Sequence, residues 1–276
     1  MACRLSVFTY HAARSSMMPN WDPQQYQRFS DERSRPFFDL VNRVPDDEVH
    51  TVADLGCGPG NLTETLVTRW PEAQIWGVDN SQEMLAAAVK LAPRPHLQFV
   101  AGDIFTWQPE RPLDRLISNA ALQWVPDHPT MIPRLVSLLA PRGVLAVQVP
   151  FNFDEPTHTL LEETRSQEPW VTILGPRQRQ FFVQTPTWYA DTLHALGMSV
   201  DLWETIYYHV LHGSDAVLEW VKGTALRPTL SKLDATQQQD FLAVYGEKLR
   251  AAYPSGPYGT LFPFKRLFFV ARWRSL

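Results

Sequence analysis

Three glycines stand at alternate positions, Gly56, Gly58 and Gly60, in the segment between residues 52 and 61. A run of β-branched and apolar residues opens this segment, and a helical pattern begins at Asn61. Glycine permits positive φ and lacks a Cβ that would collide with a ligand, while a helix start presents free amide groups. The spacing predicts a loop whose backbone closely approaches a bound cofactor.

A nicotinamide or flavin cofactor is disfavoured at this loop. The dinucleotide-binding fingerprint reads G-x-G-x-x-G or G-x-G-x-x-A. Counted from Gly56, its sixth position is Asn61, a residue too large for the close helix contact that the fingerprint requires. A glycine loop alone does not identify the ligand, so the neighbouring side chains must.

Carboxylates at the ends of the expected strands describe the ligand further. Asp54 lies at the tip of the first strand, where it would repel a pyrophosphate and attract a cationic amino acid. Asp79 ends the second strand and suits a carboxylate that accepts bonds from both ribose hydroxyls. Asp103 and Ile104 end the third strand, where an acceptor beside an exposed amide could recognise adenine. Isolated aspartates are usually turn residues, but the ordered set describes an adenosine that carries an amino-acid tail.

This set of residues resembles that of the class I S-adenosylmethionine-dependent methyltransferases, whose first motif typically reads (D/E)-x-G-x-G-x-G. The resemblance implies S-adenosyl-L-methionine as cofactor and S-adenosyl-L-homocysteine as product. It also places Asn119 in the segment that flanks the transferring methyl group. The cofactor-binding residues implied in this way are Asp54, Gly56, Gly58, Asp79, Asn80, Asp103, Ile104 and Asn119.

A nucleic-acid substrate is disfavoured by both motif and charge. DNA adenine methylation usually needs an (N/D)-P-P-(Y/F)-like motif after the fourth strand, whereas this chain has Asn119-Ala120-Ala121-Leu122 there. With 29 acidic and 25 basic residues, the net charge is -4, which does not suggest the basic stripe of a nucleic-acid enzyme. A small molecule is therefore the expected substrate.

The flanking sequence narrows the resemblance to the trans-aconitate 2-methyltransferase family. The similarity extends from about residue 20 to the end, and departs in the first residues and in details such as 262–266. It implies methyl transfer to one carboxylate oxygen of trans-aconitate, a tricarboxylate, to give a monomethyl ester. Methylation of another small acid or a phenol, and a module that binds S-adenosylmethionine without using it, are the alternatives. The segments that carry the resemblance are 21–26, 32–36, 53–61, 122–128, 155–158, 207–209, 220–221 and 226–228.

Carboxylate methylation sets the requirements of the substrate pocket. A carboxylate has a reference pKa of about 4, so at neutral pH it is already ionised and needs no general base. Binding three carboxylates in a net-negative chain calls for the planar, bidentate donors of arginine. Any one surface cation is more often simply solvated, but several are concentrated in the expected cap. The substrate-binding candidates are Arg33, Arg35, Arg177, Arg179 and Arg227, with Lys265 and Arg266 ranked behind them.

Aromatic residues and one histidine complete the candidate site. Tyr26 and Trp124 could form walls of the catalytic centre, and Tyr207 could donate a hydroxyl to the substrate, although such aromatics are more often core residues. His128 is a candidate base, yet it begins an expected helix and ester formation from a carboxylate requires no base. No cluster of His, Cys and carboxylate has metal-ligand spacing, so no metal is expected.

Alternating strand and helix patterns from Val49 onward would position these side chains. Ser81 can cap one helix, and Thr185 with Pro186 begins a later one that ends at Gly197. The expected fold is α/β: a Rossmann-like, mostly parallel sheet of seven strands with helices on both faces, plus a mainly helical cap. Strands are expected near 50–55, 74–79, 96–101, 113–118, 143–149, 198–210 and 261–273, and the other helices near 61–70, 82–92 and 129–140.

The domain organisation follows from the segments that break this alternation. Residues 1–18 are expected to be a disordered leader, and 19–276 to form one methyltransferase domain. Two cysteines predict a reducing, cytoplasmic location. The longest nearly apolar stretch, 135–151, is interrupted and cannot cross a membrane as one helix. We expect a monomer or weak dimer without a membrane or nucleic-acid partner. Cap elements are expected at about 22–44, 151–184 and 211–256.

Overall fold

The structure is a computed structural model, and it describes residues 30–91, 93–175 and 182–274. The expected leader, 1–18, and the first part of the expected cap element 22–44 lie outside these residues. The elements are α2 (Ser30–Val41), β1 (Thr51–Leu55), α3 (Asn61–Arg69), β2 (Gln74–Asp79), α4 (Gln82–Ala88), β3 (Leu97–Ala101), β4 (Leu113–Asn119), η1 (Leu122–Trp124), α5 (His128–Ser137), β5 (Leu139–Pro150), α6 (Pro156–Arg165), α7 (Trp170–Leu174), α8 (Pro186–Ala195), β6 (Met198–Leu211), α9 (Ala216–Lys222), α10 (Arg227–Leu230), α11 (Ala235–Ala252), β7 (Ser255–Gly256) and β8 (Gly259–Trp273).

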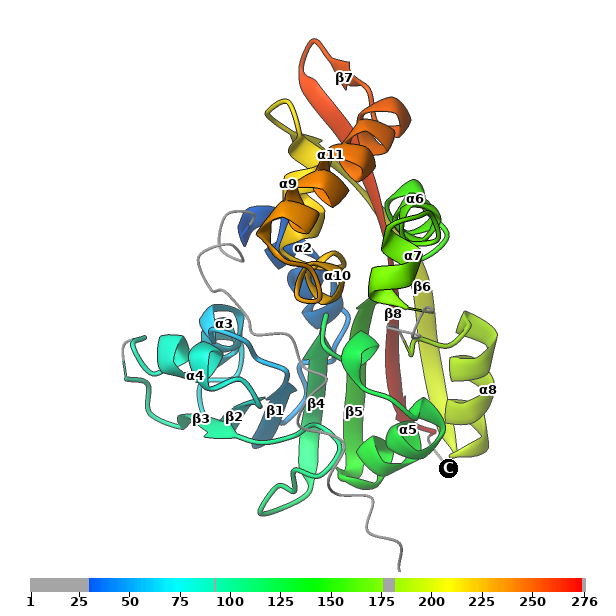
Figure 1. Cartoon of the computed structure of the whole chain (residues 1–276). Coiled ribbons are helices and arrows are strands. Elements are labelled where there is room, and N and C mark those ends of the chain that lie inside the picture. Colours follow the sequence, from blue (N-terminus) through cyan, green and yellow to red (C-terminus); the bar gives the residue numbers. More distant parts are fainter. Residues whose placement is uncertain (1–29, 92, 176–181, 275–276) are drawn as a thin grey trace, which may run out of the picture.

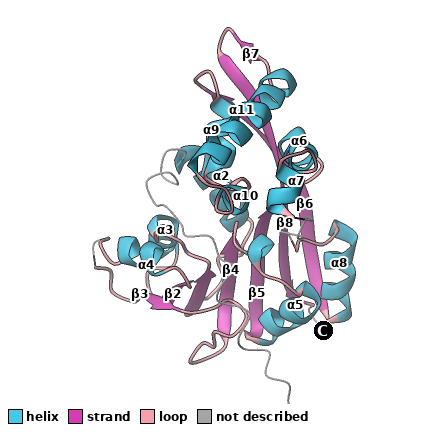
Figure 2. Ribbon diagram, viewed as in Figure 1, coloured by secondary structure: helices cyan, strands magenta, loops and turns pink. Residues whose placement is uncertain are grey.

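The strands form one sheet in the order β3-β2-β1-β4-β5-β8-β6, and the two-residue β7 pairs with β8 at its end. Strands β1 to β5 are parallel to one another, whereas β8 is antiparallel to both β5 and β6. Figure 2 shows the helices that flank this sheet. The structure confirms the Rossmann-like, mostly parallel α/β sheet, and it adds that the last strand is inserted between β5 and β6.

Alternate residues of the central strands enter two different cores. Val52 of β1 belongs to a core that includes Phe37 of α2 and Leu66 of α3. The next residue, Ala53, belongs to a second core that includes Leu135 of α5. Successive side chains of a strand point to opposite faces, so the sheet is buried on both faces, as its continuous apolar strands predict.

Local capping fixes two of the helices where the sequence indicates. The Ser81 hydroxyl accepts a hydrogen bond from the Met84 amide and begins α4. The Thr185 hydroxyl likewise accepts from the Trp188 amide and begins α8, with a proline in its first turn. Helix α4 ends at Ala88, earlier than the expected limit of 92. The caps therefore position the starts of these helices at the residues inferred from sequence.

Helices α6, α7, α9, α10 and α11 gather around the extended ends of β6 and β8 at one end of the molecule (Figure 1). They share a third core, in which Trp220 of α9, Phe241 of α11 and Phe262 of β8 are buried. Helix α2 differs from this arrangement, because its Phe37 and Leu40 belong to a core on the sheet itself. The described part of the expected cap element 22–44 is thus an element of the sheet layer.

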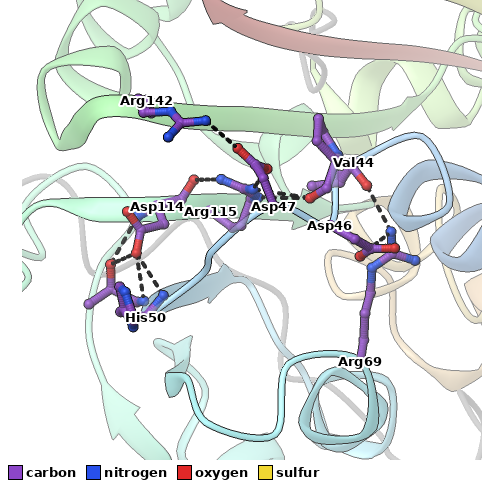
Figure 3. Close-up of polar contacts among 10 residues, drawn as sticks. Val44, Asp46, Asp47, His50, Arg69, Asp114, Arg115 and Arg142 are labelled. Carbon is purple, nitrogen blue, oxygen red and sulfur yellow. Dashed lines mark hydrogen bonds and ion pairs between the residues drawn. The ribbon is translucent and has the colours of Figure 1, made fainter.

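Polar contacts secure the loop before β1 to the amino ends of β1 and β4 (Figure 3). The Asp114 carboxylate accepts a hydrogen bond from the His50 amide at 2.8 Å. Arg115, which is 1% exposed, donates to the Pro45 carbonyl at 3.0 Å and forms an ion pair with Asp47. The charged groups at this edge of the sheet therefore hold the fold together.

No helix in the part of the chain that the structure describes has the length and apolar character needed to cross a membrane.

Candidate active site

The glycine loop follows β1 and bends across the end of β2. The amides of Gly56 and Cys57 both donate to the Val78 carbonyl, at 2.8 and 3.1 Å, which fixes the direction of the bend. The φ angles of Gly56, Gly58 and Gly60 are 79°, 56° and 79°. This left-handed region is disfavoured for residues with a Cβ, so the backbone explains why glycine occupies all three positions.

The space around these glycines distinguishes packing from ligand approach. A Cβ on Gly56 would lie 2.2 Å from the Ala121 Cβ, and one on Gly60 would lie 2.5 Å from the Phe99 ring. A Cβ on Gly58 would meet no described atom within 4 Å. Gly56 and Gly60 are therefore required for close packing, whereas Gly58 borders open space where a ligand can lie against the backbone.

Asp54 lies in β1, one residue before the strand ends and the glycine loop begins. Its carboxylate is 3% exposed and accepts a hydrogen bond from the Thr63 hydroxyl at 2.6 Å. Burial raises the pKa of Asp54 to about 7; the Thr63 hydrogen bond lowers it and the nearby Asp79 charge raises it. A cation close to Asp54 would favour its ionised form, so this position suits the ammonium group of an amino acid.

Asp79 is held in one orientation at the end of β2. Its two carboxylate oxygens accept hydrogen bonds from the Gly58 and Ser81 amides, each at 2.8 Å. Burial raises the pKa of Asp79, and these amide bonds act in the opposite direction. A carboxylate oxygen has more than one acceptor site, so Asp79 keeps capacity to accept from ribose hydroxyls beside Gly58. Asn80 follows it and is exposed.

The adenine and methyl-flanking candidates lie at the ends of β3 and β4. Asp103 is exposed, and its carboxylate accepts from the Phe105 amide at 2.8 Å. Ile104 is half-buried and close to the loop, because a Cβ on Gly56 would lie 3.6 Å from its Cδ1 atom. Asn119 has a buried side-chain oxygen with no hydrogen-bond partner among the described residues. Asp103 and Ile104 thus follow β3, whereas Asn119 is the last residue of β4, and strands β2 and β1 lie between these two strands. Ile104 adjoins the glycine loop.

Residues 119–124 form a wall on the far side of the glycine loop. Ala120 has a φ of 54°, an uncommon conformation for a residue with a Cβ. Its amide donates to the Gln148 carbonyl at 2.9 Å, and its carbonyl accepts from the Gln123 side chain at 2.7 Å. Neighbouring Ala121 contacts the loop at Gly56. Backbone strain that is held in place by several bonds is typical of functional sites.

A cavity lies on the other side of this wall, at the carboxyl ends of β4 and β5 and below the cap. Open α/β sheets bind ligands beyond the carboxyl ends of their strands. The cavity is lined by Ala120, Gln123, Trp124, Pro150, Asn152, Phe153, Thr157, His158, Trp220, Val221, Thr224, Ala225, Phe262, Phe264 and Arg266. Aromatic and aliphatic side chains from both the sheet and the cap therefore surround a small set of polar groups.

Arg266 of β8 carries the positive charge among these lining residues. It is 4% exposed, and its Nη1 atom donates to the Gln148 side-chain oxygen at 3.2 Å. Its guanidinium carbon lies 4.6 Å from the centre of the Phe264 ring. Arg266 also lines the cavity, and a planar guanidinium at a cavity wall can bind a carboxylate.

Two further polar side chains in the cavity have buried atoms. The Asn152 side-chain oxygen is buried and has no hydrogen-bond partner among the described residues, and the Thr157 hydroxyl is buried beside Tyr253, whose pKa burial raises and Thr157 lowers. Both side chains line the cavity, together with His158, whose ring packs at 5.5 Å against Phe153. Buried polar groups are normally hydrogen-bonded, so the Asn152 oxygen is a candidate for a ligand contact.

Trp124 lines the cavity, but His128 lies outside it. His128 is fully buried; its Nδ1 atom lies 2.7 Å from the Tyr189 hydroxyl, and its Nε2 atom lies 3.0 Å from the Leu122 carbonyl. A carbonyl can only accept, so Nε2 carries the proton and Nδ1 accepts from Tyr189. The Gln184 amide donates to the same tyrosine at 3.3 Å. This chain of bonds connects η1 to α8 and gives His128 a structural position.

Tyr207 also lies apart from the cavity lining. Its hydroxyl donates to the Asp39 carboxylate of α2, and its ring lies parallel to His209 with 6.3 Å between ring centres. Burial and the Asp39 carboxylate raise the pKa of Tyr207 above its ordinary value, with burial the larger cause. The tyrosine therefore connects β6 to α2 in this structure.

The arginine candidates are dispersed. Arg35 is exposed on α2, and Arg227 is half-buried at the start of α10 and is not one of the residues that line the cavity. Lys265 lies 4.9 Å from the Phe151 ring centre. Among the described arginine and lysine candidates, Arg266 is the one that lines the cavity, although the sequence ranks it behind the other arginines. The side chain of Arg33, and all of Tyr26, Arg177 and Arg179, lie outside the described residues.

Other lining residues were missed by sequence reasoning. Gln123 and His158 stand in segments that carry the family resemblance, but no chemistry was assigned to them. Arg266 and the adjacent Lys265 had a usable signal, because they interrupt the apolar run 261–270 of the last strand. Among the described side chains, no cluster of three or more His, Cys or carboxylate groups could hold a metal ion.

The chain is similar to known proteins along most of its length. The family described as "Methyltransferase domain" matches residues 52–143. A trans-aconitate 2-methyltransferase of Streptomyces avermitilis is 49% identical over 261 residues, which cover 92% of this chain and 97% of that relative. One of Escherichia coli O157:H7 is 46% identical over 256 residues, which cover 92% of this chain and 99% of that relative. A Haemonchus contortus phosphoethanolamine N-methyltransferase 2, solved with S-adenosylhomocysteine, shares the fold, with a TM-score of 0.55, 16% identity and coverage of 91% of this chain and 57% of its own.

Proposed function

The chain belongs to the trans-aconitate 2-methyltransferase family, and we propose that it transfers the methyl group of S-adenosyl-L-methionine to one carboxylate oxygen of trans-aconitate. The products are a trans-aconitate monomethyl ester and S-adenosyl-L-homocysteine. The observation that supports this function most strongly is the buried cavity that contains Arg266 and adjoins the wall against the glycine loop. It gives a polyacid a positively charged place beside the expected cofactor.

The residues present fit the cofactor. Gly58 borders open space and Asp79 stands beside it with fixed orientation, which suits a ribose that lies against the loop. Asp54 provides a carboxylate whose ionised form the ammonium group of the cofactor would stabilise. We propose that Asn80, Asp103, Ile104 and Asn119 complete this cofactor site in the roles that the family resemblance implies. When bound, S-adenosylmethionine supplies an electrophilic methyl group on a positively charged sulfur.

The chemistry that remains for the protein is positioning and exclusion of water. The acceptor carboxylate is ionised at neutral pH and attacks without a base, which agrees with the structural position of His128. A negative oxygen and a positive sulfur lose their charges as the ester forms, and this neutralisation is favoured where water is excluded. Trp124, Trp220 and Phe264 provide apolar walls of the cavity. Alignment of the reacting atoms contributes much of the acceleration in such reactions.

The location, oligomeric state, partners and domain division of the protein are also proposals. We propose that the enzyme acts in the cytoplasm as a monomer or weak dimer, with no nucleic-acid or membrane partner. The proposed location rests on the sequence, whose two cysteines, Cys3 and Cys57, do not indicate a disulfide framework. We further propose a division into a leader at 1–18 and a methyltransferase domain at 19–276, with Tyr26, Arg33, Arg177 and Arg179 near the substrate.

Transfer of a labelled methyl group tests the proposed activity. Incubation with methyl-labelled S-adenosylmethionine and a panel of tricarboxylates should give a base-labile ester, fastest with trans-aconitate. A label on nitrogen, carbon or a phenolic oxygen would exclude the carboxyl O-methyltransferase. Asp79→Ala serves as a matched control, because losing bonds to the ribose should weaken cofactor binding by about 1–3 kcal/mol. Tight cofactor binding without transfer to any acid would indicate a binding module.

A further inference from the structure

We propose that Gln123 is a positioning residue for methyl transfer: its side chain fixes the peptide of Ala120, which lies between the glycine loop and the cavity. This inference rests on the proposed function and deepens it. It gives a role in the reaction to a residue of η1 to which the sequence assigns no chemistry.

The segment 119–121 of the wall separates the two expected ligands. A Cβ on Gly56 would lie 2.2 Å from the Ala121 Cβ, so this segment packs directly on the glycine loop. The preceding residue, Ala120, lines the cavity. The expected cofactor thus lies on one side of the segment and the acid on the other. A misplacement of about 1 Å can slow a reaction about a hundredfold, so the rate depends on how firmly this segment is held.

The conformation of Ala120 must be held by its neighbours. Its φ of 54° is disfavoured for a residue with a Cβ. Its amide donates to the Gln148 carbonyl of β5 at 2.9 Å, and its carbonyl accepts from the Gln123 Nε2 atom at 2.7 Å. Both polar backbone atoms of this strained residue are therefore fixed, one by the sheet and one by the Gln123 side chain.

Gln123 can hold Ala120 because its own backbone is anchored. It is 4% exposed, and its carbonyl accepts from the Phe182 amide at 3.3 Å. The carbonyl of the preceding Leu122 lies 3.0 Å from the Nε2 atom of the buried His128. These contacts connect η1 to α5 and to the segment before α8. The bond from Gln123 to Ala120 therefore starts from a fixed position.

The other end of the Gln123 side chain distinguishes it from a purely structural contact. Its Oε1 atom is buried and has no hydrogen-bond partner among the described residues. Buried polar atoms are normally hydrogen-bonded, and an unpaired one lowers stability. One bond that fixes the wall, together with one unpaired atom, is a combination expected at a functional position.

Gln123→Met removes the bond and keeps the length of the side chain. The kcat for trans-aconitate should fall about ten- to a hundredfold, whereas the KM for trans-aconitate and the Kd for S-adenosylhomocysteine should change by less than about threefold. Gln238→Met is the matched control. The Gln238 Nε2 atom also donates to backbone carbonyls, those of Leu230 and Leu233 at 2.9 and 3.0 Å, but it lies in the cap outside the cavity lining. This variant should keep the kcat of the unmodified chain.

Gln123→Glu separates positioning from a contribution to folding. The Ala120 carbonyl can only accept, so the introduced carboxyl can replace the lost bond only while it is protonated. Burial raises the pKa of a carboxyl, so the ratio of variant kcat to unmodified kcat should rise at least about fivefold from about pH 8.5 to about pH 5.5. His158 and Arg266, the ionisable side chains among the described lining residues, are present in both proteins and do not affect this ratio. The corresponding ratio for Gln123→Met should not change with pH.

Crystal structures of Gln123→Met and of the unmodified chain, each with S-adenosylhomocysteine, test the inference without turnover. The Ala120 carbonyl should be displaced in the variant. An unmoved carbonyl, an unchanged kcat in the folded variant, equal losses of kcat and cofactor affinity, or a pH-independent ratio for Gln123→Glu would overturn the inference. If the carbonyl is displaced but the unmodified chain methylates no acid, the proposed function fails instead, so the two failures are distinguishable.

Discussion

Replacing Asp54 by asparagine tests whether the carboxylate at the end of β1 is kept in a state suited to a cationic ligand. Burial raises its pKa from 3.8 to about 7. A group whose pKa is higher in the folded state than in the unfolded state stabilises the fold most below the unfolded value. That stabilisation is lost as the pH rises towards the folded value. The chain without cofactor should therefore become less stable between pH 4 and pH 7 because of this one group.

The magnitude follows from the same two values. At about 1.4 kcal/mol per pKa unit, the whole effect is about 4 kcal/mol, of which about 2 kcal/mol falls between pH 5 and pH 7. Asparagine has nearly the same shape, keeps an oxygen for the Thr63 hydroxyl and does not ionise. The free energy of unfolding of Asp54→Asn should therefore exceed that of the unmodified chain at pH 7, and the difference should shrink towards pH 4.

Urea unfolding at a series of pH values measures this difference directly. Calorimetry tests the role of Asp54 in cofactor binding. If the ammonium group of the cofactor lies near Asp54, cofactor binding at pH 6 should release a proton. Asp54→Asn should bind the cofactor more weakly and without proton release. Titrations in two buffers with different ionisation enthalpies report the proton. Parallel pH dependences of unfolding for the two proteins, or equal cofactor affinity, would refute the reasoning.

Three other predictions concern the glycine loop, the ion pair between Asp47 and Arg115, and the position of His128. Gly58→Ala should cost about 1 kcal/mol of stability because of its positive φ, yet weaken cofactor binding at least tenfold. Unchanged cofactor affinity in calorimetry would contradict the proposal that the cofactor lies against the backbone at Gly58. Asp47→Asn should destabilise the fold by about 2 kcal/mol, since it leaves the buried Arg115 without its ion pair, while cofactor affinity stays unchanged in the same titration. Tyr189→Phe should cost about 1–3 kcal/mol in urea unfolding, because the buried Nδ1 atom of His128 loses its donor. Methyl transfer per folded molecule should persist. A variant that keeps full stability but loses methyl transfer would indicate a catalytic role for His128.

The sequence predicts the fold and the conformation of the glycine loop well for a physical reason. Strand-loop-helix units are local, and the turn after β1 needs positive φ at Gly56, Gly58 and Gly60, so the pattern of residues reports the geometry directly. Asp54 and Asp79 end adjacent parallel strands, and such ends meet at one edge of the sheet. These positions could therefore be inferred without knowledge of distant contacts.

The cavity could not be inferred in the same way, because distant segments of the chain form its lining. Arg266 meets Gln148 only because β8 enters the sheet beside β5, a pairing across 118 residues of sequence. Thr157 joins them from a cap helix, and no local pattern indicates which cations face inward. His128 shows the converse, since a residue of catalytic type is held by the distant Tyr189.

A crystal structure of the ternary complex with S-adenosyl-L-homocysteine and trans-aconitate tests the central claim most directly. The account predicts the cofactor backbone against Gly58 with its ribose on Asp79, one substrate carboxylate on Arg266, and another directed past Trp124 at the sulfur. Density for the acid outside the cavity, or a cofactor that does not contact the glycine loop, would contradict it.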